Sequence, residues 1–220
     1  MDTKLLKYLC IREKTMASAR AEELWKMALQ ITHEYTWWKK ISIEEFAEAF
    51  HPFYQSSQAV QKLLQNSTNV YLLAVSIGSY IEDLAREFMK NKQPFNGYIL
   101  DRMGSYLVKI EIEKLDRSIS SEAKSLGYTS TKRFSPGYGD FPLEAPQVFV
   151  ELIKSAIPWI KLAANGQIIP EKTVTALKGG QIQGIKIILQ FKNLNSCKDL
   201  VCFLVLYQVK TIVASHIATG

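Results

Sequence analysis

The sequence predicts an α+β fold in which helices pack on a twisted, mostly antiparallel sheet, within a single domain that spans residues 1–220. Two patterns indicate this class. Apolar residues recur at helical spacing through much of the first 155 residues, and later segments tend towards alternation and are rich in Ile, Val and Leu. Helices followed by a block of strands are typical of α+β proteins. We therefore expect the sheet to come mostly from residues after 155.

The first third of the chain is expected to be mainly helical. Residues 4–12 form an apolar segment that should pack on the core, and residues 19–35 carry apolar side chains at a period of 3.6. Ser57 is a suitable N-cap for a helix that extends to Leu64, because its hydroxyl can accept a hydrogen bond from the first turn. We therefore expect two helices here, preceded by the apolar N-terminal segment.

The middle of the chain combines one strand with three helices. Residues 70–75 form a short apolar run, which predicts a buried strand, and a helix is expected over residues 80–89. The longest helical pattern extends from Tyr98 to about Lys124. Residues 148–153 again show helical spacing, and Pro146 is acceptable in the first turn of that helix.

The last third is expected to form strands. Residues 157–163 and 168–169 flank Asn165-Gly166, which is a strong hairpin signal. Gly179-Gly180 is interpreted as a turn. Three further segments rich in Ile, Val and Leu are expected to be strands: residues 182–191, 200–206 and 208–217.

Composition and charge describe an ordinary soluble protein. Hydrophobic residues make up 47% of the chain and charged residues 22%, and the net charge of +6 does not by itself indicate nucleic acid. The longest apolar run, Leu200–Tyr207, is too short to span a bilayer, and no signal-peptide pattern is present at the start. Cys10, Cys197 and Cys202 form no disulfide framework and are expected to be small core residues. We expect a cytoplasmic protein that binds neither nucleic acid nor membranes.

Neither a metal centre nor a nucleophilic site is indicated. Cys197 and Cys202 are five positions apart without a second pair, and His33, His51 and His216 share no ligand spacing. No histidine lies in a nucleophile motif, and no Gly-x-Gly-x-x-Gly follows a strand. We therefore assign no metal ligand and no catalytic residue.

Residues 132–151 differ from the rest of the chain, with three prolines, two glycines and four aromatic residues. Ser135–Tyr138 fits a type II turn, because Pro136 sets φ at its second position and Gly137 supplies the positive φ of its third. Arg133 carries a planar fork of donors that suits a carboxylate or a phosphate. We expect an ordered loop, a kind of segment that often carries function. From turn chemistry alone, the simpler interpretation is a structural loop whose arginine ties down a carbonyl.

The eleven residues 133–143 read Arg-Phe-Ser-Pro-Gly-Tyr-Gly-Asp-Phe-Pro-Leu, and we call them the signature loop. They resemble the signature of the activation domain of cobalamin-dependent methionine synthase, in which an Arg-x-x-Pro-Gly-Tyr loop contacts S-adenosylmethionine (AdoMet). The longer match is similar to the stand-alone bacterial form of this domain. Weaker similarities to the family occur at residues 7–12, 76–78, 100–105 and 170–174.

The resemblance implies a subunit that binds AdoMet and reactivates a cobalamin-dependent methionine synthase. Its role would be to position AdoMet for the reductive methylation of cob(II)alamin, with the cobalamin held by the partner protein and an electron supplied by a donor such as flavodoxin. The chain would then be an accessory subunit of a methyltransferase. The cofactor-binding residues that the resemblance implies are Arg133, Phe134, Ser135, Pro136, Gly137, Tyr138 and Asp140.

Each of these residues has an expected role. Arg133 would pair with the AdoMet carboxylate, and backbone groups of residues 135–137 would meet the adenine or the ribose. The rings of Phe134 and Tyr138 would stack on the ligand or attract its sulfonium. Asp140 would either balance the ligand ammonium or cap the local turn.

Two departures from the family pattern leave alternatives open. Gly127 stands where some activation domains have an acidic residue, and residues 175–178 contain no counterpart of the paired tyrosines of the family. The chain could therefore be a non-catalytic, partner-binding homologue that has lost AdoMet. It could also be an activator of a different corrinoid methyltransferase.

Overall fold

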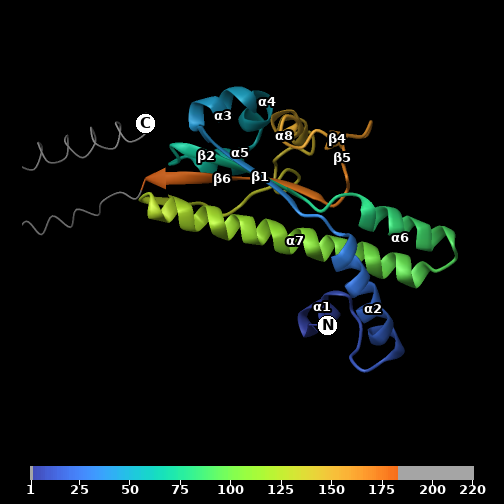
Figure 1. The fold of residues 1–220 in the computed structure, drawn as a ribbon. Coiled ribbons are helices and arrows are strands. Elements are labelled where there is room, and N and C mark those ends of the chain that lie inside the picture. Colours follow the sequence, from blue (N-terminus) through green and yellow to red (C-terminus); the bar gives the residue numbers. More distant parts are fainter. Residues whose placement is uncertain (1, 183–220) are drawn as a thin grey trace, which may run out of the picture. The chain divides into compact units, whose positions relative to one another are not determined.

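A four-stranded antiparallel sheet is the centre of the computed structural model, which describes residues 2–182 (Figure 1). In spatial order the strands are β1 (Tyr35–Ser42), β2 (Asn69–Ser76), β6 (Thr173–Ile182) and β3 (Tyr128–Ser130). β2 is buried from Val70 to Ser76 because it lies between two strands and is covered on both faces. This confirms the buried strand predicted at residues 70–75.

One face of the sheet is covered by α7 (Pro94–Ser125), a helix of 32 residues, with α1 (Thr3–Tyr8), α2 (Met16–Ile31) and α6 (Tyr80–Lys90) packed around it (Figure 1). Odd-numbered residues of β2 point into this core, because side chains of a strand alternate between faces. The buried residues that join helices and sheet here include Leu24, Leu73, Val75, Leu100 and Leu107.

The opposite face is covered by four short helices: α3 (Ile43–Ala49), α4 (His51–Ser56), α5 (Gln58–Leu64) and α8 (Pro146–Ile153) (Figure 1). Aromatic rings fill this second core. The rings of Phe50 and Phe149 meet edge to face with centroids 5.1 Å apart, and even-numbered residues of β2, such as Leu72, pack against them. Together the two cores give the layered α+β architecture that the sequence predicts.

The predicted helices are confirmed with shifted ends. The Ser57 hydroxyl accepts a hydrogen bond from the Val60 N–H at 3.1 Å, so Ser57 is the N-cap of α5 as expected. The helix predicted from Tyr98 begins four residues earlier, because Pro94 is accommodated in its first turn. The helix predicted over residues 19–35 ends at Ile31, and Tyr35 already belongs to β1.

Within the described residues, most of the sheet comes from earlier in the chain than predicted. Three of the four strands of the sheet come from the first 130 residues, and β1 was not expected at all. The small hairpin formed by β4 (Lys161–Leu162) and β5 (Ile168–Ile169) is confirmed, with Gly166 at φ +82° in its turn, but it lies outside the main sheet. The strands predicted at 200–206 and 208–217, and all but the first residue of that at 182–191, lie outside the described residues.

Gly179 and Gly180 were interpreted as a turn, and the structure corrects this to the interior of β6. A Cβ on Gly179 would collide with the side chain of Ser67, and one on Gly180 would lie 2.9 Å from the Tyr71 ring. The glycines are therefore required by close packing of neighbouring residues against the strand. Cys10 was expected in the core and is exposed instead.

The described residues, 2–182, lie within one compact unit. That the same domain extends to residue 220 stays a prediction. Across residues 2–182, no helix combines the length and the apolar character that a bilayer-spanning segment needs.

Candidate ligand-binding site

The segment that leads into the signature loop is held on the edge of β6. The Thr131 N–H donates to the Gly179 carbonyl at 2.9 Å, and the Gly179 N–H donates to the Thr131 hydroxyl at 2.8 Å. Three residues later, Phe134 and Leu177 exchange two backbone hydrogen bonds of 2.8 Å each. The chain therefore continues along β6 beyond the end of β3 and starts the signature loop at a fixed position.

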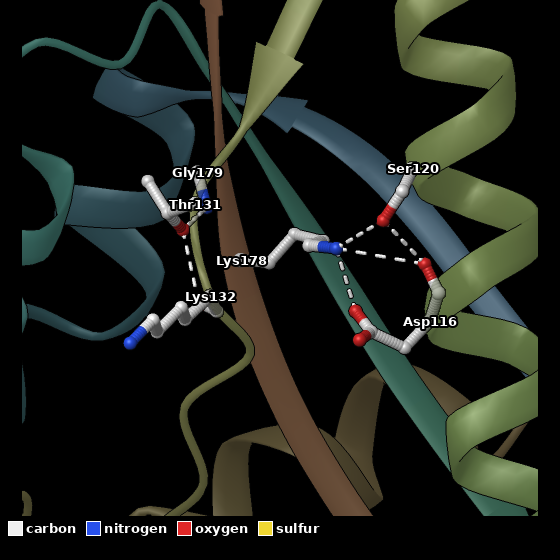
Figure 2. A network of polar contacts seen from close by, with 6 residues as sticks. All are labelled: Asp116, Ser120, Thr131, Lys132, Lys178 and Gly179. Carbon is white, nitrogen blue, oxygen red and sulfur yellow. Dashed lines mark hydrogen bonds and ion pairs between the residues drawn. The ribbon is translucent and has the colours of Figure 1, made fainter.

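The same strand is tied to α7 by a buried lysine (Figure 2). The Lys178 ammonium donates to the carboxylate of Asp116 and to the hydroxyl of Ser120, both at 2.6 Å. Lys178 is only 2% exposed, so its charge is stabilised by these partners and not by water. Because Lys178 lies next to Gly179, the strand that anchors the loop is also the strand that positions α7.

The turn predicted at Ser135–Tyr138 is present. Gly137 has φ +84°, and the Tyr138 N–H donates to the Ser135 carbonyl at 3.2 Å, which closes the turn. The Gly137 N–H also donates to the Phe141 carbonyl at 2.8 Å, so the loop is braced from inside. A Cβ on Gly137 would lie 2.7 Å from the Leu143 side chain. The glycine is therefore needed both for its backbone conformation and for space beside Leu143.

Asp140 fastens the far end of the turn to α5. Its carboxylate accepts hydrogen bonds from the Ser57 hydroxyl at 2.6 Å, from the Gln58 N–H at 2.8 Å and from the Ala59 N–H at 3.2 Å. These bonds, the one from Ser57 foremost, lower the pKa of the Asp140 carboxyl. Asp140 therefore acts as a cap for a helix whose N-cap, Ser57, lies 83 residues earlier, and not for the local turn.

Between α7, the signature loop and the edge of β6 lies a cavity of about 590 Å³, which is within the range of small-molecule sites. We call it the loop cavity. Its walls come from five parts of the chain. The residues that line it are Ser105, Val108, Lys109 and Ile112 of α7, Arg133–Pro136 and Tyr138 of the loop, Thr173–Thr175 of β6, Pro146 and Ile168.

The edge of β6 offers backbone groups to the loop cavity. Leu177 directs its N–H and carbonyl towards Phe134, and backbone directions alternate along a strand. Thr173 and Thr175 therefore direct their N–H and carbonyl groups towards the same edge of β6, at positions beyond the Phe134–Leu177 pair. Since both threonines line the loop cavity, it has backbone donors and acceptors besides side chains.

The charged groups that line the loop cavity are both cations. Arg133 is half-buried and Lys109 is exposed. Within residues 2–182, neither side chain forms a hydrogen bond or an ion pair, and no carboxylate is among the lining residues. The alternative in which Arg133 ties down a carbonyl is therefore not what the described part of the chain shows. An unpaired guanidinium at a cavity wall is suited to an anionic group of a ligand.

The structure brings most of the predicted site residues together. Five of the seven line the loop cavity, while Gly137 shapes the turn and Asp140 holds it on α5. The ring of Phe134 lies between the loop cavity and the second core, with its centroid 6.3 Å from that of Phe141. Tyr138 lines the cavity as well and is 66% exposed.

Sequence reasoning missed the walls contributed by α7 and β6. Ser105, Val108, Lys109 and Ile112 follow one stripe of α7, a spacing that could have indicated a shared face but not what that face meets. In the described residues, no group of three or more His, Cys, Asp or Glu side chains is placed to hold a metal ion.

Comparison with known proteins supports the fold assignment. No protein-family model matches the sequence, and no curated protein matches it. Among solved structures, the chain is similar to the MetH reactivation domain bound to S-adenosylhomocysteine (AdoHcy), with a TM-score of 0.52 and 13% identity, over 83% of this chain and 70% of that one. At this identity the likeness concerns architecture. The chain therefore has the α+β fold of the MetH reactivation domain, as the resemblance of its signature loop predicted.

Proposed function

We propose that this chain binds AdoMet in the loop cavity and serves as the reactivation subunit of a cobalamin-dependent methionine synthase. The observation that carries the proposal is that the signature loop lines a cavity of about 590 Å³ and contributes to it a guanidinium without a partner among the described residues. The fold shared with the MetH reactivation domain supports the same conclusion.

The loop cavity has groups suited to the carboxylate, the adenine and the ribose of AdoMet. Arg133 would take the carboxylate with its planar fork. The backbone edge at Thr173–Thr175 and the groups around Ser135 would meet the adenine and the ribose, which carry both donors and acceptors. Tyr138, whose ring is exposed, would cover the ligand at the mouth of the cavity.

The protein's contribution to the reaction would be to bind and orient AdoMet. AdoMet supplies an electrophilic methyl group on its sulfonium, and cobalamin would be held by the partner protein. No general acid or base is needed for such a transfer, and the residues assigned here bind and orient. The loop is fixed on β6 and α5, so the position of a bound ligand would be defined before the partner docks.

A second candidate is a partner-binding homologue that has lost AdoMet. The observation in its favour is that no carboxylate lines the loop cavity among the described residues, so no opposite charge there balances the ligand ammonium. Asp140, the predicted candidate, is held by α5. In this case the chain would still associate with a corrinoid protein but would bind no AdoMet.

Two measurements test the proposal. The first is calorimetric titration of the full chain with AdoMet, where we expect saturable binding at one site. The second is reactivation of a cob(II)alamin-loaded methionine synthase that lacks its own activation domain, with AdoMet and a chemical reductant. We expect methionine formation to recover only when the chain is present.

The outcomes separate the candidates. Association with the synthase without any heat from AdoMet would favour the homologue that has lost AdoMet. AdoMet binding combined with recovery of a different corrinoid methyltransferase, and none of methionine synthase, would identify an activator of another methyl transfer. Absence of both AdoMet binding and association would refute the proposal.

A further inference from the structure

Within residues 2–182, β1 is paired on one side only. It is the first strand in the spatial order of the sheet and pairs with β2 in one continuous register over its eight residues. The Ile43 N–H donates to the Thr68 carbonyl at 3.2 Å in the same register, and backbone directions alternate along a strand. The odd-numbered residues of β1 therefore bond to β2. The N–H and carbonyl groups that point away from β2 belong to Thr36, Trp38 and Lys40, and we call them the β1 edge.

The charged side chains beside the β1 edge are both basic. Lys39 and Lys40 are exposed and are the only charged residues of β1, and β2 has none. The nearest acidic residues in the sequence, Glu34 and Glu44, lie beyond the two ends of the strand. Across the described part of the chain, no ion pair involves either lysine. The strand therefore presents two cations that are available to a partner.

Exposed aromatic rings extend the same surface. Trp38 is 40% exposed, and its ring packs against that of Tyr71 with centroids 6.2 Å apart. At the start of β1, the rings of Tyr35 and Trp159 meet edge to face with centroids 4.7 Å apart, and both residues remain accessible to solvent. Aromatic side chains are enriched where proteins contact one another. The surface thus combines free backbone groups, rings and positive charge.

The lysines decide between two kinds of occupant. Lysine on an exposed strand edge is a common means of preventing a protein from pairing with itself. Two copies joined through the β1 edge would bring their lysine pairs together, and each chain carries a net charge of +6. A strand with carboxylates would instead be attracted by the same lysines. Charge complementarity therefore favours an acidic segment of another protein over a second copy.

From this we propose that the β1 edge binds an extended acidic segment of a partner protein, which adds a fifth strand to the sheet. Thr36, Trp38 and Lys40 would exchange backbone hydrogen bonds with the segment, and the two lysine ammonium groups would meet its carboxylates. The loop cavity adjoins β6, and β2 lies between β1 and β6. Docking at the β1 edge would therefore leave the loop cavity open, and the proposal does not depend on AdoMet binding.

The probe is the acetylated and amidated octapeptide Thr-Val-Glu-Glu-Val-Thr-Val-Thr, titrated into the full chain by calorimetry. In antiparallel pairing its glutamates lie opposite Lys40 and Lys39, and the valine that follows them lies opposite Trp38. We expect one peptide to bind per chain. The matched peptide with two lysines in place of the glutamates tests charge. The peptide N-methylated at the valine opposite Trp38 lacks an N–H that strand pairing needs, and it should bind about tenfold more weakly.

Amide hydrogen exchange, followed by NMR, locates the peptide. In the free chain the N–H groups of Thr36, Trp38 and Lys40 should exchange quickly, because they have no partner within the described residues. The glutamate peptide should slow their exchange. The N–H groups of Trp37 and Lys39 already bond to β2, so their exchange should change much less.

Variants of the chain test the two components separately. Thr36→Pro removes an outward N–H without removing a bond to β2, a change that edge strands tolerate, and it should weaken the glutamate peptide about tenfold. Lys39→Glu should weaken it about fivefold at 0.1 M salt, because exposed ion pairs are individually modest. Lys92→Glu makes the same change of net charge between α6 and α7 and should bind like the parent. Thermal melts verify that each variant is folded.

Three results would overturn the proposal. The first is absence of binding by the glutamate peptide. The second is equal binding of the lysine or the N-methylated peptide, which would exclude recognition by charge or by strand pairing. The third is slow exchange of the three outward N–H groups in the free chain, which would mean that the β1 edge is already covered.

Discussion

Replacing Arg133 by alanine tests the candidate site most directly. In the proposed mode its guanidinium makes a charge-assisted pair with the ligand carboxylate, and hydrogen bonds to charged groups contribute roughly 1.5–3 kcal/mol. Arg133 is half-buried, so solvent screening places the expected loss at about 2 kcal/mol. At about 1.4 kcal/mol per tenfold, AdoMet affinity should fall roughly 30-fold.

The stability of the same variant separates ligand binding from a structural role. The Arg133 side chain makes no hydrogen bond within residues 2–182, so its removal should cost less than about 0.5 kcal/mol. In a domain of this size, that corresponds to a change in Tm of less than about 2 °C. Arg133→Lys should restore only part of the affinity, because a point charge cannot reproduce the fork.

Calorimetric titration and thermal melts of the same proteins provide the assay. Lys132→Ala is the matched control, because Lys132 is the adjacent exposed cation and does not line the loop cavity. It should bind AdoMet like the parent chain. The reasoning is refuted if Arg133→Ala melts several degrees lower while its affinity for AdoMet is unchanged.

Three further changes test how the site is held. Asp116→Ala leaves the buried Lys178 ammonium without its carboxylate and should destabilise the fold by about 3 kcal/mol, measured as a lower urea midpoint at unchanged slope. The double variant Asp116→Ala, Lys178→Met should recover part of this stability. A loss below about 1 kcal/mol in Asp116→Ala would contradict the role of the ion pair in holding α7 on β6. Gly137→Ala places a Cβ at φ +84° and 2.7 Å from the Leu143 side chain, and it should cost about 1 kcal/mol in thermal melts and weaken AdoMet binding. Leu143→Ala in the same chain should recover only part of the stability, because it removes the clash but not the backbone strain, and full recovery would contradict the backbone contribution. Burial raises the pKa of Glu82 more than the hydrogen bonds from the backbone lower it, so the folded state favours the protonated carboxyl. The stability of the parent chain should therefore fall as the pH rises from the ordinary glutamate pKa of about 4.3 through the raised pKa of the folded state. Glu82→Gln keeps an acceptor for the Lys172 N–H, so the denaturation midpoint of this variant relative to the parent should rise between pH 4 and pH 7, and a difference that does not change with pH would refute the assignment.

The elements that were predicted correctly are those that a pattern within their own residues identifies. α7 and β2 were found because a long stripe of apolar residues and a short apolar run each identify themselves without reference to the rest of the chain. The turn of the signature loop was found for the same reason, since Pro136 and Gly137 fix its backbone by their own chemistry.

β6 could not be predicted, because its lysine and its two glycines are unusual in a buried strand and are explained only by contacts with residues distant in the sequence. Lys178 is buried through an ion pair with a residue 62 positions earlier, and Gly179 and Gly180 are required by the side chains of Ser67 and Tyr71. β1 was missed because it is an edge strand with largely exposed side chains, so neither burial nor alternation marks it.

In the candidate site, too, some residues could be identified from a local pattern and others only from the folded structure. Residues of the signature loop were identified from the loop itself, but its surroundings depend on contacts between distant segments. Asp140 was assigned to the ligand or to the local turn, whereas it binds Ser57, 83 residues earlier. Lys109 was not considered, because only the packing of α7 against β6 brings it to the loop cavity.

The shared attachment to β6 also bears on how a ligand would enter. Two walls of the loop cavity are fastened to one strand. α7 is held on β6 by the Lys178–Asp116 ion pair and the signature loop by the Phe134–Leu177 backbone pair, so neither wall can move away from β6 without breaking these contacts. We therefore expect the described walls of the cavity to form a rigid receptor. Association with AdoMet should then be a single-step, second-order process whose observed rate rises linearly with ligand concentration, with no slow closing phase to delay the encounter with the partner.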